Sequence, residues 1–263
     1  PPPPPAPAAT APVLLAGKFD ALHLGHKALV RAACERGDPV MLSFSGMAEI
    51  LGMAKRKPLV AEAERLRVLR AWAEEFGKEV RTVEIAFGRV RGYSPEEFVD
   101  FVIRELGAKG IVCGMNWRFG YKAAGNIDTL VQLGEEKDLP VEIVDYVMCE
   151  GLRISSTRVR ATLESGDMAL VAKMLGRPHV LKGRAARSSA GALVLPEADW
   201  INLGPADGRY SVVIERPKRS TCVPATAIVE TVEGEGRRVM LEVDAGVDWA
   251  KDLKNAELVR LRF

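Results

Sequence analysis

Between residues 13 and 177 short apolar runs alternate with amphipathic stretches, and this alternation limits the possible folds more than any other feature. Apolar runs bounded by turn residues are typical of buried strands, and apolar positions three or four apart are typical of helices. Strands and helices that alternate at this spacing favour an α/β fold, in which helices cover a parallel sheet. The expected strands are 12–16, 39–44, 79–85, 109–113 and 140–147, and the expected helices are 24–36, 61–76, 95–106, 124–136, 156–165 and 167–175.

The pattern changes at about residue 180. Short β-rich runs follow, divided by clusters of Gly, Pro and Asp, and this spacing predicts a small antiparallel barrel or sandwich. At the other end, residues 1–12 are mostly proline and alanine. Such a segment favours extended polyproline II, cannot bury a core, and is expected to be a disordered tail. We therefore expect a tail at 1–12, an α/β domain at 13–180 and a β domain at 181–263, with strands at 192–196, 209–216, 222–230, 237–243 and 257–263.

Composition excludes several classes of protein. The chain of 263 residues is 48% hydrophobic and 27% charged, so it can build proper cores. A net charge of +2 gives no strong field for nucleic acid, and no apolar run approaches a membrane span. We expect neither nucleic acid nor membrane as a partner. Four cysteines without a CxxC pair indicate reduced thiols in a soluble intracellular protein.

Two histidines lie in the turn between the first strand and the first helix. His23 and His26 flank Gly25 at the helix start, where unpaired backbone N–H groups and the helix dipole favour anions. Glycine allows a ligand close to the backbone, and the imidazoles can hydrogen-bond phosphate oxygens. An ordinary helix start is the plain alternative. A zinc site would need two more ligands, and the third histidine is the distant His179.

A second helix start, near residue 155, carries three hydroxyls and three arginines within eight residues. Serine and threonine are normal at a helix N-cap, but capping does not require so many donors. Hydroxyls, helix N–H groups and planar guanidinium groups together suit a triphosphate. The residues are Arg153, Ser155, Ser156, Thr157, Arg158 and Arg160.

Together, the His-x-Gly-His stretch and the Ile-Ser-Ser-Thr-x-x-Arg stretch resemble the HxGH nucleotidylyltransferases. The resemblance extends to the FMN adenylyltransferase (FAD synthetase) module of the bacterial riboflavin kinase/FAD synthetases, over about residues 12–182. Lys18 stands where bacterial members usually have Asn, and this form is closer to the plant and algal plastid enzymes. The supporting stretches are Ser94–Phe98, Gly114–Gly120, Ala124–Gly125 and Leu175–Pro178.

The resemblance implies a Rossmann-like domain that makes FAD and pyrophosphate from ATP and FMN, with Mg²⁺ offsetting the phosphate charge and no dedicated protein metal ligands. It also implies a plastid stroma or cytoplasmic location and gives no oligomeric state. The implied catalytic residues are His23, His26 and Arg160. The implied ATP-binding residues are Gly17, Phe19, Asp20, Gly25, Arg153, Ser155, Ser156 and Thr157, and the implied FMN-binding residues are Asn116, Trp117, Arg118 and Phe119.

The β domain occupies the place of the riboflavin kinase domain in the bacterial proteins, and we interpret it as a degenerate form of that domain. The kinase's Gly-x-Pro-Thr-Ala-Asn segment should occur between Gly183 and Gly208, where no Pro-Thr-Ala-Asn is present. We therefore expect no riboflavin kinase activity, and expect FAD synthesis to survive a cut near Leu181 if the remaining piece stays soluble. The alternatives are a bifunctional enzyme, a nucleotidylyltransferase with another acceptor such as nicotinamide mononucleotide or a pantetheine phosphate, and a binding module without catalysis.

Overall fold

The chain folds as two units, neither of which is a single continuous segment. The computed structural model describes residues 11–54, 56–188, 192–216, 221–234, 236–243 and 257–263. Residues 1–10 of the expected disordered tail lie outside the described residues. The first unit comprises 1–19, 25–55 and 67–147, and the second comprises 20–24, 56–66 and 148–263.

A five-stranded parallel sheet forms the centre of the first unit, in the order β3-β2-β1-β4-β5. This confirms the predicted α/β fold. β1 has β2 on one side and β4 on the other, so the strand order reverses there, and ligands of such sheets bind at the carboxyl ends of these strands. The strands are β1 (Pro12–Ala16), β2 (Asp38–Ser45), β3 (Arg81–Ala86), β4 (Gly110–Gly114) and β5 (Val141–Val144).

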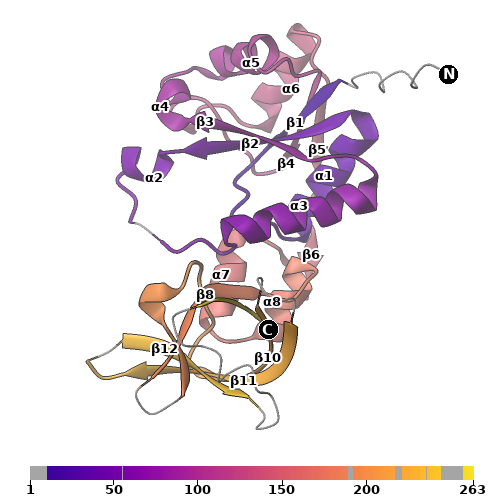
Figure 1. The fold of residues 1–263 in the computed structure, drawn as a ribbon. Helices are drawn as coiled ribbons and strands as arrows, with labels where there is room; N and C mark the ends of the chain where they lie inside the picture. Colours follow the sequence, from indigo (N-terminus) through magenta and orange to yellow (C-terminus); the bar gives the residue numbers. More distant parts are fainter. Residues whose placement is uncertain (1–10, 55, 189–191, 217–220, 235, 244–256) are drawn as a thin grey trace, which may run out of the picture. The chain divides into compact units, whose positions relative to one another are not determined.

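Helices cover both faces of this sheet, with α5 and α6 on one side and α1 and α3 on the other (Figure 1). Alternate residues of β1, Leu14 and Ala16, pack in one core with Phe98 and Val102 of α5 and Leu130 of α6. A capping box at Ser94 fixes the start of α5. The helices are α1 (Leu24–Arg36), α2 (Met47–Ile50), α3 (Glu62–Phe76), α4 (Phe87–Val90), α5 (Pro95–Arg104), the 3₁₀ turn η1 (Tyr121–Ala123) and α6 (Ile127–Glu136).

The second unit contains a closed barrel of six antiparallel strands, in the order β10-β11-β12-β9-β8-β13. This confirms the predicted β domain. The inward side chains form a separate core that includes Leu181, Leu195, Val239 and Leu261, each fully buried. The strands are β8 (Val180–Arg187), β9 (Leu193–Pro196), β10 (Gly208–Arg216), β11 (Thr221–Val232), β12 (Gly236–Val243) and β13 (Glu257–Arg262), with a 3₁₀ turn, η2 (Glu197–Asp199), after β9.

Two helices and a hairpin precede the barrel in the same unit. α7 packs against α8, and α8 ends at Gly176, whose left-handed backbone (φ 68°) suits glycine. A Cβ at this position would lie 2.5 Å from a methyl of Leu24, so the close approach also requires glycine. The elements are β6 (Met148–Cys149), β7 (Leu152–Arg153), α7 (Ser156–Glu164) and α8 (Met168–Leu175).

Candidate active site

The turn after β1 carries the His-x-Gly-His stretch. Gly17 lies close to the ring of Phe19, because a Cβ there would approach that ring to 3.3 Å. The buried Phe19 ring meets His26 edge-on, with ring centroids 5.0 Å apart. Gly25 lies in the first turn of α1. The aromatic contact fixes the orientation of the His26 ring at the carboxyl end of β1.

His23 is a buried neutral imidazole. Its pKa is lowered to about 4, mainly by burial and to a smaller extent by the positive charge of Arg177, against a backbone hydrogen bond that raises it. At neutral pH the ring therefore has one N–H donor and one acceptor nitrogen. An unperturbed histidine changes its charge near neutral pH, and burial moves this change for His23 into the acid range. His23 can donate a hydrogen bond to a phosphate oxygen without carrying a positive charge.

Arg177 holds the turn that carries His23. Its guanidinium donates to the carbonyl oxygens of Leu22 (2.6 Å), Ala21 (2.9 Å) and Leu175 (3.1 Å). Leu22 has a positive φ of 48°, which is unusual for a leucine and is maintained here by full burial and by this clamp. Burial lowers the pKa of Arg177 to about 10, so it stays charged at neutral pH. Arg177 lies within Leu175–Pro178, one of the stretches that carry the family resemblance, and its sequence context does not predict this role.

The Ser-Ser-Thr stretch begins α7, as predicted. Ser155 is the N-cap and accepts a hydrogen bond from the backbone N–H of Arg158. The hydroxyl oxygen of Ser156 is buried and has no hydrogen-bond partner among the described residues, whereas Thr157 is exposed. Arg153 is exposed at the end of β7. The helix start therefore presents hydroxyls beside its free backbone N–H groups, an arrangement that suits an anion.

Arg158 has a different role from the other arginines of this stretch. Its Nη1 donates to the carbonyl oxygens of Cys149 (2.9 Å) and Leu152 (2.8 Å), which closes the β6–β7 hairpin against α7. Both targets are backbone carbonyls of the hairpin itself. Arg158 therefore supports the local backbone, and we give it no part in ligand binding.

Within the second unit, Arg160 joins α7 to the turn that carries His23. Its Nη2 donates to Oδ2 of Asp20 over 3.0 Å, although the two residues are 140 positions apart. Its Nη1 donates to the carbonyl oxygen of Lys57 over 3.1 Å. The other carboxylate oxygen of Asp20 accepts from the N–H of Leu59 over 3.3 Å. Asp20, Arg160 and the segment at 57–59 thus form one hydrogen-bonded group.

The loop after β4, in the first unit, carries the residues expected to bind flavin. Trp117 stacks on Phe119 with ring centroids 4.6 Å apart, and both rings pack against Phe98 of α5. The guanidinium of Arg118 donates twice to the carbonyl oxygen of Ala123. Asn116 is exposed. Of the four expected residues, Phe119 is buried in the core, Trp117 covers it, Arg118 braces the loop, and the Asn116 amide faces solvent.

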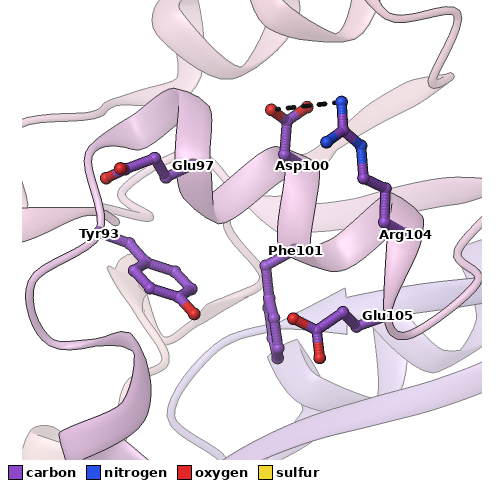
Figure 2. A pocket seen from close by; sticks show the side chains of 6 residues that line it. All are labelled: Tyr93, Glu97, Asp100, Phe101, Arg104 and Glu105. Carbon is purple, nitrogen blue, oxygen red and sulfur yellow. Dashed lines mark ion pairs between the residues drawn. The ribbon is translucent and has the colours of Figure 1, made fainter.

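A shallow hollow of about 370 Å³ lies beside α5 (Figure 2). Its charged groups already have partners. Glu97 completes the capping box, Asp100 pairs with Lys137 (2.9 Å), and Glu105 pairs with Arg89. We therefore assign no ligand to this hollow. Its lining residues are Tyr93, Glu97, Asp100, Phe101, Arg104 and Glu105.

Among the described residues, no three His, Cys, Asp or Glu side chains come together in a group that could hold a metal ion. In the same part of the chain, no helix has the length and apolar character needed to cross a membrane.

Comparison with known proteins gives a consistent result. Residues 7–158 match the family model described as FAD synthetase. The chain is 36% identical over 271 residues to FAD synthetase 2, chloroplastic, of Arabidopsis thaliana, covering 95% of this chain and 72% of that protein. It is 38% identical over 219 residues to FAD synthetase 1, chloroplastic, of the same plant, covering 75% of this chain and 62% of that protein.

A bacterial relative and a solved structure extend the comparison. The chain is 32% identical over 254 residues to the bifunctional riboflavin kinase/FMN adenylyltransferase of Pseudomonas fluorescens, covering 92% of this chain and 80% of that protein. A crystal structure described as a macrolide-efflux protein from Streptococcus pneumoniae shares the fold. It has a TM-score of 0.79 and 24% identity, over 97% of this chain and 86% of that one. On the family match and these identities, the chain is an enzyme that belongs to the FAD synthetase (FMN adenylyltransferase) family.

Proposed function

We propose that this chain transfers AMP from ATP to FMN, giving FAD and pyrophosphate, and that it does not phosphorylate riboflavin. The family uses ATP and FMN. The observation that carries the proposal is the hydrogen bond between Asp20 and Arg160. It joins the His-x-Gly-His turn to the first turns of α7, and these are the two stretches whose residue types suit a triphosphate.

In the proposed reaction an oxygen of the FMN phosphate attacks the α-phosphorus of ATP in line, and pyrophosphate leaves. No covalent intermediate on the protein is needed, so catalysis consists of positioning and charge stabilisation. Arg160, Ser156 and Thr157 hold the β- and γ-phosphates, with Arg153 beside them. His23 and His26 contact the phosphates around the α-phosphorus. His23 acts as a neutral donor, because burial lowers its pKa to about 4.

The other residues of the two motifs hold these proposed phosphate ligands in place. Gly17 and Gly25 allow the nucleotide close to the backbone, and Phe19 sets the ring of His26. Ser155 serves as the N-cap that orders the α7 start. Asp20 holds the guanidinium of Arg160 at a defined place. These residues contribute preorganisation, which keeps the donors in position as charge develops.

Mg²⁺ is part of the proposal, bound through the nucleotide. This ion keeps several waters and usually takes one or two carboxylates together with substrate phosphates. The surroundings of Asp20 fit this mode of binding. Asp20 is a half-exposed carboxylate beside the proposed phosphate ligand Arg160, and no cage of acidic side chains surrounds it among the described residues. Mg²⁺ would offset the charge of the departing pyrophosphate.

For the flavin side we propose Asn116 as the polar contact, since its amide is exposed and can both donate and accept. Trp117, Phe119 and Arg118 then contribute to FMN binding mainly by holding this loop in its conformation. The stack of Trp117 on Phe119 and the bonds from Arg118 to Ala123 support that division of roles.

The absence of kinase activity rests on the sequence at 183–208, which lacks Pro-Thr-Ala-Asn although β8 and β10 are present on either side. Bifunctional relatives also match this chain, so the point needs a direct test. We propose 13–180 as the adenylyltransferase domain and 181–263 as a riboflavin kinase-like domain without its reaction. The chloroplastic relatives support the plastid stroma as the location.

The experiment is to incubate purified protein with ATP and Mg²⁺ and with either FMN or riboflavin, and to separate the flavin products. We expect FAD and pyrophosphate from FMN, and no FMN from riboflavin. Nicotinamide mononucleotide and pantetheine phosphate, offered in parallel, should not be adenylylated. FMN formed from riboflavin at a rate comparable to that of FAD synthesis would establish the bifunctional alternative instead. Absence of pyrophosphate release with every acceptor would leave only a binding function.

A further inference from the structure

Residues 57–61, which we call the strap, lie between the barrel and the proposed phosphate ligands within the second unit. Leu59, Val60 and Ala61 are buried. On one side the strap is hydrogen-bonded to both Arg160 and Asp20, which form an ion pair. The carbonyl oxygen of Lys57 accepts from Arg160, and the N–H of Leu59 donates to Asp20. The positions of Asp20 and Arg160 therefore depend on where the strap backbone lies.

On its other side the strap is bound to the segment at 197–203 that follows β9. The ammonium of Lys57 donates to the carbonyl oxygens of Glu197 (2.8 Å) and Trp200 (2.7 Å). The N–H of Leu203 donates to the carbonyl oxygen of Pro58 over 2.9 Å. The side-chain amide of Asn202 donates to the carbonyl oxygen of Leu59 over 3.2 Å.

The segment at 197–203 is itself fixed to the barrel. Trp200 is 3% exposed, and its indole N–H donates to the carbonyl oxygen of Leu195 in β9. Asn202 is fully buried, accepts from the N–H of Lys182 and donates to the carbonyl oxygen of Val180 in β8. Because these partners belong to paired barrel strands, the segment is a firm support for the strap.

We propose that Lys57 is a positioning residue, which transmits the fixed geometry of the barrel to Arg160 and Asp20. This inference rests on the proposed function of those two residues. The side chain of Lys57 anchors the same residue whose backbone carbonyl receives Arg160. Charge-assisted hydrogen bonds from an ammonium to two carbonyls are stronger than neutral ones. Without them the strap keeps its anchors at Pro58 and Leu59 and loses the one nearest Arg160.

The inference gives the barrel a function that does not require kinase chemistry. A cut near Leu181 would remove Glu197, Trp200 and Asn202, and with them the support of the strap. The inference therefore predicts that FAD synthesis is lost after such a cut, in contrast to the expectation drawn from the sequence. The barrel is then retained because the phosphate-binding side chains are positioned on it.

The first test compares Lys57→Met and Lys57→Arg with the control Lys173→Met in the full chain. Lys173 lies on α8 in the same unit, and its ammonium contacts only the exposed Glu150 in the described structure. We expect Lys57→Met to raise KM for ATP or lower kcat about tenfold or more, because small misplacements of catalytic groups are costly. KM for FMN should stay within about twofold, and Lys57→Arg should recover most of the loss because it restores donors to the two carbonyls. An equal rise in KM for both substrates, or kinetics no different from those of Lys173→Met, would overturn the inference.

The second test does not depend on activity. Hydrogen exchange measured by mass spectrometry should be faster in the 57–61 peptide of Lys57→Met than in wild type, and unchanged in peptides from β11 and β12. Unchanged exchange in the strap would overturn the positioning role. If the wild-type protein makes no FAD, the proposed function fails, and exchange still decides whether Lys57 orders the strap. Should Lys57→Met not fold, Lys57→Gln, which keeps one amide donor group, takes its place in both measurements.

Discussion

The proposed phosphate ligands of the second unit and the flavin loop of the first unit are held in opposite ways. Arg160 has defined partners for both terminal nitrogens, and the turn that carries His23 is clamped by Arg177. Asn116 is exposed, and its side chain makes no hydrogen bond to any residue that the structure describes. Its loop is fixed by the Trp117–Phe119 stack, the Arg118 brace and the backbone hydrogen bonds between Phe119 and Gly125, none of which involves the Asn116 side chain.

This difference matches two chemical tasks. Groups that stabilise charge in a transition state work best when they are already in place, because no reorganisation is then needed during the reaction. A group that recognises the edge of a ligand can remain solvated until the ligand arrives. We therefore expect substitutions of the proposed phosphate ligands to act on turnover and on ATP, and substitutions in the flavin loop to act on FMN.

The largest expected effect follows substitution of the fixed phosphate ligands. Arg160→Ala and His26→Ala should each lower kcat by about a hundredfold or more, the range found when one transition-state donor is removed. Steady-state kinetics with ATP and FMN measures this, and circular dichroism should show an intact fold. Arg104→Ala is a matched control, because that arginine is exposed on α5. A near-normal kcat in either variant would remove that residue from its proposed role.

A second expected effect concerns the stability of the second unit at acid pH. Burial lowers the pKa of His179 to about 4, with a smaller contribution from Arg177 against a raising hydrogen bond to Leu203. Because the unfolded chain takes up this proton near pH 6.5, stability is present above that pH and is lost as the pH falls toward 4. At pH 5 the loss is about 2 kcal/mol for this residue. His23, with a similarly lowered pKa, acts in the same direction.

Urea unfolding at pH 7.5, 6.0 and 5.0 measures this loss. The variant His179→Gln cannot titrate, so its stability should fall less steeply between pH 6.5 and 5 than that of the wild type. The slope is the readout, since the substitution also changes stability at neutral pH. A wild-type stability that is constant down to pH 5, or an unchanged slope in the variant, would contradict the burial of a neutral His179.

Much of the fold could be predicted because local pattern and tertiary packing agree. Helix α1 has the predicted bounds of 24–36, since its apolar spacing and the following Gly37 both mark the same element. Strand β8 was missed. Val180–Arg187 contains Lys182, Arg184 and Arg187 and no aromatic residue, so its sequence does not favour a strand. This segment forms a strand because it pairs with β13 and β9 in the barrel.

The candidate site could be proposed from the sequence only where side-chain chemistry marks it. His23, His26 and the Ser155–Thr157 stretch stand out because imidazoles and hydroxyls at helix starts suit phosphate. The contact between Asp20 and Arg160 could not be derived, because 140 residues separate them and only the fold brings them together. The roles of Arg177 and Lys57 could not be derived for another reason. Their targets are backbone carbonyls, which leave no signature in the sequence.

The smallest expected effect tests the other side of the comparison. Asn116→Ala should raise KM for FMN by about tenfold, because the flavin's polar edge loses one hydrogen-bond partner. KM for ATP and kcat at saturating FMN should stay close to wild type, since the fixed phosphate ligands are untouched. Met115→Ala, at the neighbouring exposed position, is the control for general disturbance of the loop. An equal effect on both substrates, or an effect on ATP alone, would mean that the loop does not act as a separate flavin contact. Because Asn116 is solvated in the described structure, its loss should also leave thermal stability nearly unchanged, which separates a binding role from a structural one.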